Sequence, residues 1–219
     1  MNKEVFAKTA SDVVYALDHM LLGIADLDRG IAWILEKTGV KATMGGSHPG
    51  MGTRNALVSI GNRQYIEIIS IDPAQKQTGW MAALVQNLDV PQLITWAVST
   101  QDINALSDQA KAASYSTEGP SSGERAKPDG SILQWRTLRI ISSLGNVIPF
   151  FIEWGIGIRH PSQDSPSGCR LKAFRIEHPE ADHVQNMLSS LGIRTVVNPG
   201  RKPRLRAILS TPKGTVELQ

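Results

Sequence analysis

The chain has 219 residues, of which 41% are hydrophobic, so it can bury the core of one large domain or two small ones. Polar residues interrupt every apolar stretch before it reaches membrane-spanning length, and residues 1–12 lack the apolar centre of a secretory signal, so we expect a cytoplasmic protein with no membrane partner. The net charge of +3 is modest and the densest basic cluster, residues 201–206, contains no aromatic residue that could stack on bases; we therefore expect no nucleic-acid partner.

The first third of the chain predicts a strand, a helix and further strands. Asp26 is a suitable helix N-cap, apolar residues then recur at helical spacing, and Gly39 is a suitable helix stop. The predicted elements are, in order, a strand over 14–22, a helix over 27–38, a glycine-rich polar loop over 44–53, and strands over 55–61 and 64–71.

The rest of the chain repeats this order twice, after a helix predicted over 79–88. Asp102 is the N-cap of the second copy's helix, and in the third copy Pro179 is at the first position of a helix that Gly192 ends. The second copy has strands over 93–99, 132–141 and 149–154, a helix over 103–113 and a polar loop over 114–131; the third has strands over 170–176, 195–198, 205–210 and 215–218. The sequence thus predicts an α+β fold of three βαβββ modules over 1–75, 91–160 and 168–219, with a connecting helix in 76–90.

A glutamate recurs in the last strand of each copy, at Glu67, Glu153 and Glu217. Side chains alternate between the two faces of a sheet, so each glutamate points away from its apolar neighbours. Carboxylates are costly to bury unless they are paired or bind a metal. The repeat therefore indicates either a liganded face of the sheet or structural glutamates satisfied by hydrogen bonds or arginine.

Several motifs, together with this repeat, resemble the vicinal oxygen chelate superfamily, and more closely its bacterial glyoxalase-like domain proteins. The motifs are LDHM at 17–20, GGSH at 45–48, GTRNAL at 52–57, PFFIEW at 149–154 and TPKGTVEL at 211–218. The resemblance covers nearly the whole chain. It implies that the first two modules pair into one cupped sheet, to which the third C-terminal module is added.

The resemblance also implies a divalent metal site between the first two modules. It assigns His19, Glu67 and Glu153 as ligands, which suit Zn, Mn, Fe, Co or Ni. Counting seven residues back from the two N-caps leads to His19 in the first module and to Thr95 in the second. Because a neutral hydroxyl is a poor ligand for a divalent cation, the fourth position is vacant in this assignment, and the protein can also be metal-free.

Other side chains are candidates for contact with a substrate. His48, in a polar loop, can titrate near neutral pH and act as an acid or base; it can equally be an exposed turn residue. The resemblance favours Trp135 and Arg136 as pocket residues, where Arg136 would bind a substrate carboxylate or neutralise Glu153. Asn55, at the start of a strand, can donate to a substrate oxygen or serve only in a turn.

The expected function is a metal-dependent lyase or isomerase of the glyoxalase type that acts on a small oxygenated organic substrate. Glu153 is the expected base, with His48 as a second catalytic residue. The alternative is a non-catalytic protein that binds or sequesters a small molecule in the same pocket. We also expect a homodimer, because the fold normally pairs its modules and this chain has an odd number of them.

Overall fold

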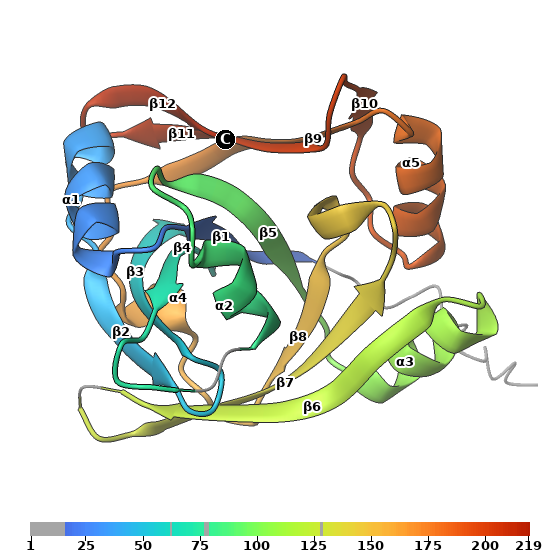
Figure 1. Ribbon diagram of the computed structural model, residues 1–219, viewed down its shortest axis with the longest axis horizontal. Helices are drawn as coiled ribbons and strands as arrows, with labels where there is room; N and C mark the ends of the chain where they lie inside the picture. Colours follow the sequence, from blue (N-terminus) through green and yellow to red (C-terminus); the bar gives the residue numbers. More distant parts are fainter. Residues whose placement is uncertain (1–15, 62, 77–78, 128) are drawn as a thin grey trace, which may run out of the picture.

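The computed structural model describes residues 16–61, 63–76, 79–127 and 129–219 (Figure 1). The polar start, 1–12, and the first residues of the strand predicted over 14–22 lie outside the described residues. Within the described part, no helix is long and apolar enough to cross a membrane.

The first two modules each have the predicted order βαβββ, and they form one curved sheet of eight strands. The first module consists of β1 (Ala16–Gly23), α1 (Leu27–Thr38), β2 (Thr43–His48), β3 (Thr53–Gly61) and β4 (Gln64–Ile71), and the second of β5 (Gln92–Ser99), α3 (Ile103–Ala112), β6 (Ser116–Ala126), β7 (Ile132–Ile141) and β8 (Phe150–Trp154). The strand order β2-β3-β4-β1-β5-β8-β7-β6 brings the two modules together through the antiparallel pair β1 and β5. The predicted pairing into a cupped sheet is confirmed, and α2 (Trp80–Val85) forms the connecting helix.

The helices of these modules begin at the predicted N-caps. Asp26 accepts a hydrogen bond from the backbone N–H of Arg29 at 3.0 Å, and Asp102 accepts one from Ala105 at 2.9 Å. These bonds satisfy N–H groups that have no partner within the first turn of a helix. Gly39 ends α1 with a φ of 79°, a left-handed conformation that glycine adopts without steric cost.

Two segments predicted as polar loops are mainly edge strands. β2 lies within 44–53 except for its first residue and pairs only with β3, while β6 lies within 114–131 and pairs only with β7. An edge strand hydrogen-bonds to one neighbour and leaves much of its surface in solvent, so it needs no alternation of apolar residues. These segments are rich in glycine and serine, which are not typical of strands, so the sequence predicted loops there.

The third module forms a separate four-stranded sheet. It consists of β9 (Arg170–His178), α5 (Ala181–Ser190), β10 (Val197–Pro199), β11 (Arg204–Thr211) and β12 (Gly214–Leu218), and is preceded by the short helices η2 (Gly145–Val147) and α4 (Pro161–Asp164). Its chain order is again βαβββ, but the strand order β10-β9-β11-β12 places its first strand inside the sheet. α5 begins at Ala181, two residues later than the predicted start at Pro179.

The two faces of the eight-stranded sheet pack against different partners. The outer face shares a continuous apolar core with α1, α3 and the third sheet, in which Trp96 of β5 packs on Phe174 of β9 with ring centroids 5.1 Å apart. Figure 1 shows the third sheet lying across one side of the molecule, from α1 to α5. The inner face has a smaller apolar cluster that includes Ala97, Ile152 and Val85 of α2. This leaves part of the inner face available for a cavity.

Because one apolar core joins all three modules, we predict that they unfold in a single cooperative transition. Trp96→Ala should lower the free energy of unfolding by about 3 to 5 kcal/mol, since Trp96 is almost fully buried between the two sheets. Trp33→Ala, at a partly buried position on α1, is the control and should cost about 1 kcal/mol. Scanning calorimetry measures both. A separate transition of the third module that Trp96→Ala leaves unchanged would contradict this prediction.

Candidate functional site

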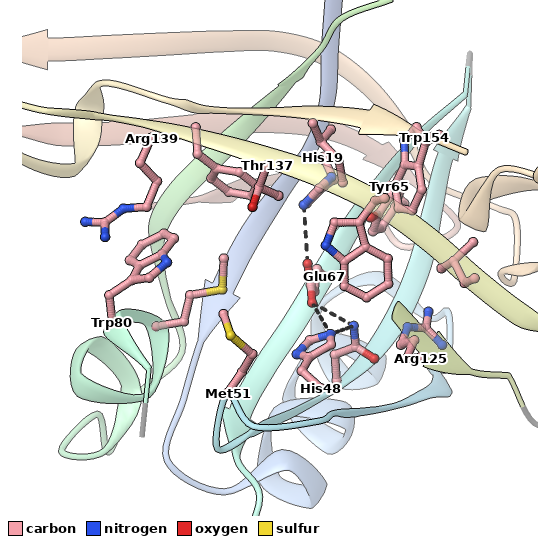
Figure 2. Close-up of a pocket in the computed structure, with 16 residues that line it drawn as sticks. His19, His48, Met51, Tyr65, Glu67, Trp80, Arg125, Thr137, Arg139 and Trp154 are labelled. Carbon is pink, nitrogen blue, oxygen red and sulfur yellow. Dashed lines mark hydrogen bonds and ion pairs between the residues drawn. The ribbon is translucent and has the colours of Figure 1, made fainter. Parts of the chain in front are cut away.

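A cavity lies on the inner face of the eight-stranded sheet, and its sides differ in chemistry (Figure 2). The first module contributes polar side chains from four neighbouring strands: His19, His48, Asn55 and Glu67. The facing wall, from the second module and α2, is mainly aromatic and apolar; it contains Trp80, Met81, Trp135, Phe150, Ile152 and Trp154. Arg125 of β6 and Arg139 of β7 also line the cavity. The site is therefore polar on one side and hydrophobic on the other.

Asp18 fixes the orientation of His19. A β-bulge in the pairing of β1 with β5 lies at Asp18 and interrupts the alternation of side chains, so that both consecutive residues take part in the buried network. Asp18 Oδ1 lies 2.7 Å from His19 Nδ1, while Oδ2 accepts from Trp154 Nε1 at 2.9 Å and lies 3.1 Å from His160 Nε2. The other nitrogen of His19, Nε2, therefore points to Glu67 Oε2, 3.3 Å away.

The buried charges of this network stabilise one another. Burial by itself lowers the pKa of His19, but the hydrogen bonds and charges of Asp18 and Glu67 outweigh it and raise the pKa to about 9. Burial raises the pKa of Glu67, but hydrogen bonds from His19 and Asn55 and nearby imidazole charges lower it to about 2. The pKa of Asp18 is also lowered, because the bonds from His160 and His19 outweigh burial. At neutral pH an imidazolium thus lies between two carboxylates.

Asn55 connects His48 to this network. Its Nδ2 donates to Glu67 Oε1 at 2.6 Å and lies 3.2 Å from His48 Nε2, while His48 Nδ1 is 2.8 Å from Thr53 Oγ1. Burial lowers the pKa of His48, so its ring is neutral at neutral pH and its Nε2 accepts the bond from Asn55. Glycine is required at Gly45, because a Cβ there would overlap Asn55 Oδ1.

Most of the predicted site residues meet in the cavity, but two do not. Those that line it are His19, His48, Asn55, Glu67 and Trp135. Glu153 instead lies on the outer face, where it accepts from the backbone N–H of Ile103 at 3.3 Å and from Arg136 at 3.3 Å. Arg136 also donates to Asn104 of α3 at 2.7 Å. The prediction that Glu153 joins the other two ligands is therefore wrong, and so is a pocket role for Arg136.

The register of the sheet explains this error. His19 of β1 and Ala97 of β5 lie opposite each other, so they occupy equivalent positions in the two modules. The β1–β4 and β5–β8 pairings extend this equivalence to the last strands, where Glu67 of β4 corresponds to Ile152 of β8. Glu153 is one residue further along β8. A shift of one residue moves a side chain to the other face of a sheet, so Glu153 points to α3 although its sequence context resembles that of Glu67. Glu217, the third repeated glutamate, pairs with Arg206 on the third sheet.

Comparisons with known proteins decide the family. A family model described as a glyoxalase-like domain matches residues 17–192. The chain belongs to the glyoxalase-like domain family. It is thus a member of the vicinal oxygen chelate superfamily, as the motifs predicted.

A solved structure with the same overall arrangement supports the fold of this glyoxalase-like protein. A hypothetical protein from Staphylococcus aureus is similar with a TM-score of 0.67 and 19% identity, over 93% of this chain and 84% of the other. Methylmalonyl-CoA epimerase from Mycobacterium tuberculosis is similar with a TM-score of 0.48 and 19% identity, over 68% of this chain and 93% of the other. No curated protein matches the chain at a significant level.

The donor atoms of this glyoxalase-like protein do not complete the predicted metal site. His19 and Glu67 are close enough to share an ion, but the matching positions on the second module are Ala97 and Ile152. Thr95, expected at the fourth position, lies opposite Leu21 instead. Within the described residues, no group of three or more His, Cys, Asp or Glu is arranged to hold a metal ion. Metal binding by His19 and Glu67 stays a prediction.

Several residues of the cavity and of the buried network beside it were not predicted from the sequence. The sequence could have indicated Asp18, because it directly precedes His19 and a histidine is often oriented by a carboxylate. Tyr65 stacks on His19 with ring centroids 4.5 Å apart. The sequence could have indicated it too, because it lies two residues before Glu67 and so is on the same face of the strand. The sequence did not indicate Arg125, since nothing in its polar segment predicts a buried side chain.

The coupled pKa shifts predict how stability depends on pH. The His19 pKa is raised from 6.5 to about 9, so its contribution is complete below pH 6.5 and is lost as the pH rises through 9. The Glu67 pKa is lowered from 4.5 to about 2, so its contribution is complete above pH 4.5 and is lost as the pH falls through 2. This pair should therefore stabilise the protein most between pH 4.5 and 6.5.

Glu67→Gln tests this dependence. It removes one partner of a buried ion pair and should lower the free energy of unfolding by about 3 kcal/mol at mildly acidic pH. The variant should also lose less stability than wild type when the pH falls below 4.5 or rises above 6.5. Urea unfolding across pH measures this, with Glu153→Gln on the outer face as the matched control. Equal pH profiles for wild type and Glu67→Gln would show that the pair is not coupled as described.

Proposed function

We propose that this glyoxalase-like protein binds a small oxygenated organic molecule in the cavity and does not convert it. One observation supports this proposal above others: the cavity has a polar half from the first module and an aromatic half from the second. Aromatic side chains bury apolar surface, while a few convergent polar groups fix the orientation of a ligand. A ligand with an apolar body and neighbouring oxygens would fill both halves.

Each half has a defined role in this proposal. Trp135 and Trp154 present their rings in a T-shaped pair with centroids 6.1 Å apart, and the apolar body of the ligand would pack on them. His48 faces Trp135 with ring centroids 6.2 Å apart. The nitrogen atoms of His48 and Asn55 already have protein partners, but Asn55 Oδ1 has none among the described residues and would accept a hydrogen bond from a hydroxyl group of the ligand. The two halves together would select a molecule that is apolar at one end and oxygenated at the other.

The buried charges favour binding over catalysis. A general acid or base is most effective when its pKa lies near the working pH. The Glu67 carboxylate, with a pKa of about 2, is a weak base, and His19, with a pKa of about 9, already directs both ring nitrogens to carboxylates. Glu153, the expected base, lies on the other face of the sheet. This is why we favour the non-catalytic reading over the lyase or isomerase that the sequence led us to expect.

Binding can be measured with phenacyl alcohol, an aromatic α-hydroxy ketone, by calorimetry and tryptophan fluorescence. Wild type should bind it equally well with and without a metal chelator, and Trp135→Ala should weaken binding about tenfold through loss of the aromatic wall. Trp33→Ala, on α1 outside the cavity, is the matched control and should bind as wild type. Binding that survives Trp135→Ala unchanged, or that needs an added divalent metal, would overturn the proposal.

A divalent-metal-dependent lyase or isomerase is the second candidate, and the contact between Asp18 and His19 favours it. Histidines that bind metals usually direct their second nitrogen to a carboxylate, as His19 Nδ1 does here. Only His19 and Glu67 present donors of the predicted set, so we derive no catalytic step through a metal. In this second candidate His48 would be the catalytic residue beside the metal.

Metal titration separates the two candidates. If the second is correct, zinc or manganese should bind wild type and bind His19→Ala at least about tenfold more weakly, because one donor is lost. Glu153→Gln should bind metal as wild type does, since Glu153 lies outside the cavity. Calorimetry on chelator-treated protein provides the measurement. Equal or absent binding in wild type and His19→Ala would exclude the second candidate.

We also propose that the protein is cytoplasmic and forms a homodimer, with no nucleic-acid or membrane partner. The third sheet packs against the outer face of its own chain, so the odd module already has a packing partner within the chain. A dimer would therefore use another surface. Sedimentation velocity of the full chain would test it.

A further inference from the structure

We propose that Arg125 forms an anion-binding subsite in the cavity and that the ligand is a small organic carboxylate. This inference rests on the proposed function and specifies the class of ligand. The carboxylate would bind the guanidinium of Arg125, while the rest of the molecule would pack on the aromatic wall. Figure 2 shows Arg125 beside His48 on one side of the cavity, with Arg139 on the opposite side.

Arg125 is a buried cation with few partners. Its side chain comes from the edge strand β6, only 5% of the residue is exposed, and it lines the cavity. Its guanidinium donates to the backbone carbonyl of Gly45 on β2. Among residues 16–61, 63–76, 79–127 and 129–219, no carboxylate forms an ion pair with it. A guanidinium has five N–H donors, and the hydrogen bond to Gly45 involves only its Nη1 atom.

The surrounding chain provides space for this guanidinium. A Cβ on Gly45 would lie 3.2 Å from Arg125 Nη2, and one on Gly46 would lie 3.5 Å from Nη1. The two consecutive glycines thus let the guanidinium lie close against the backbone of β2. Desolvation of an unpaired charge is costly, which makes burial without a countercharge unfavourable unless a ligand supplies one.

The carboxylates near Arg125 already have other partners. Glu67, on the same cavity, interacts with His19 and Asn55 and attracts Arg125 only over a longer distance. A neighbouring hollow, also lined by Arg125, contains Asp164, which pairs with Lys127 at 3.0 Å and with Arg159 at 2.6 Å. Neither carboxylate neutralises Arg125 directly.

The other cavity arginine differs in this respect. Arg139 pairs with Glu118 and lies over the ring of Trp80, with its guanidinium carbon 4.1 Å from the ring centroid. Arg136, on the outer face, pairs with Glu153. Both therefore have a protein countercharge, which Arg125 lacks within the described residues. A planar guanidinium with adjacent donors binds a carboxylate through two parallel hydrogen bonds, so this is the anion that fits best.

The test compares two probes of similar shape, phenylglyoxylate and its neutral amide, in calorimetric titrations of the full chain. Wild type should bind the acid about tenfold or more tightly than the amide, because a charge-assisted hydrogen bond is stronger than a neutral one. Arg125→Gln should lose this preference, because its binding of the acid should weaken much more than its binding of the amide. Arg125→Lys, which keeps the charge but not the paired donors, should retain part of the preference. Arg136→Gln is the matched control and should retain all of it.

Each outcome has a defined meaning. Equal binding of acid and amide by wild type would overturn the carboxylate subsite and leave the proposed binding function intact. A preference that persists in Arg125→Gln would place the anion elsewhere and also overturn the inference. If neither probe binds at millimolar concentration while phenacyl alcohol does, the carboxylate class is wrong. If none of the three compounds binds, the proposed function fails together with this inference.

Discussion

The antiparallel pairing of β1 with β5 is the constraint on which the other features depend. It joins the two modules at the centre of the sheet and fixes His19 opposite Ala97. Side chains alternate along regular strands, so this register, together with the pairings of the other strands, decides which residues face inward. A shift of one residue would move His19 into the outer apolar core and bring Met20 into the cavity.

The outer face provides the stability that a polar inner face needs. Its core is shared with α1, α3, α5 and the third sheet, and it includes large buried side chains such as Trp96 and Phe151. Burial of this apolar surface is the main favourable term in folding. The third module therefore completes the fold by covering the sheet, and no residue of β9 to β12 lines the inner cavity.

Charge in the cavity is arranged so that most buried ions have a partner. Asp18 and Glu67 flank His19, and this arrangement keeps all three ionised at neutral pH while it lowers the basicity of Glu67. Such a pairing stabilises the protein but leaves little capacity for proton transfer. Arg125 is the exception, because its countercharge is missing from the described residues. The paired charges thus favour binding over catalysis, and Arg125 without a countercharge favours a ligand with a negative charge.

The sequence by itself determined the repeated βαβββ order, the helix caps at Asp26 and Asp102, and the family, because local spacing and motifs carry this information. It also indicated His19 and His48, which lie in recognisable motifs, and Glu67, which belongs to the repeated glutamates. Only the tertiary structure decided that Glu153 lies outside the cavity and that Arg125 lies inside it. Local sequence does not specify strand register or which edge strands meet, since both result from pairing between segments distant in the chain.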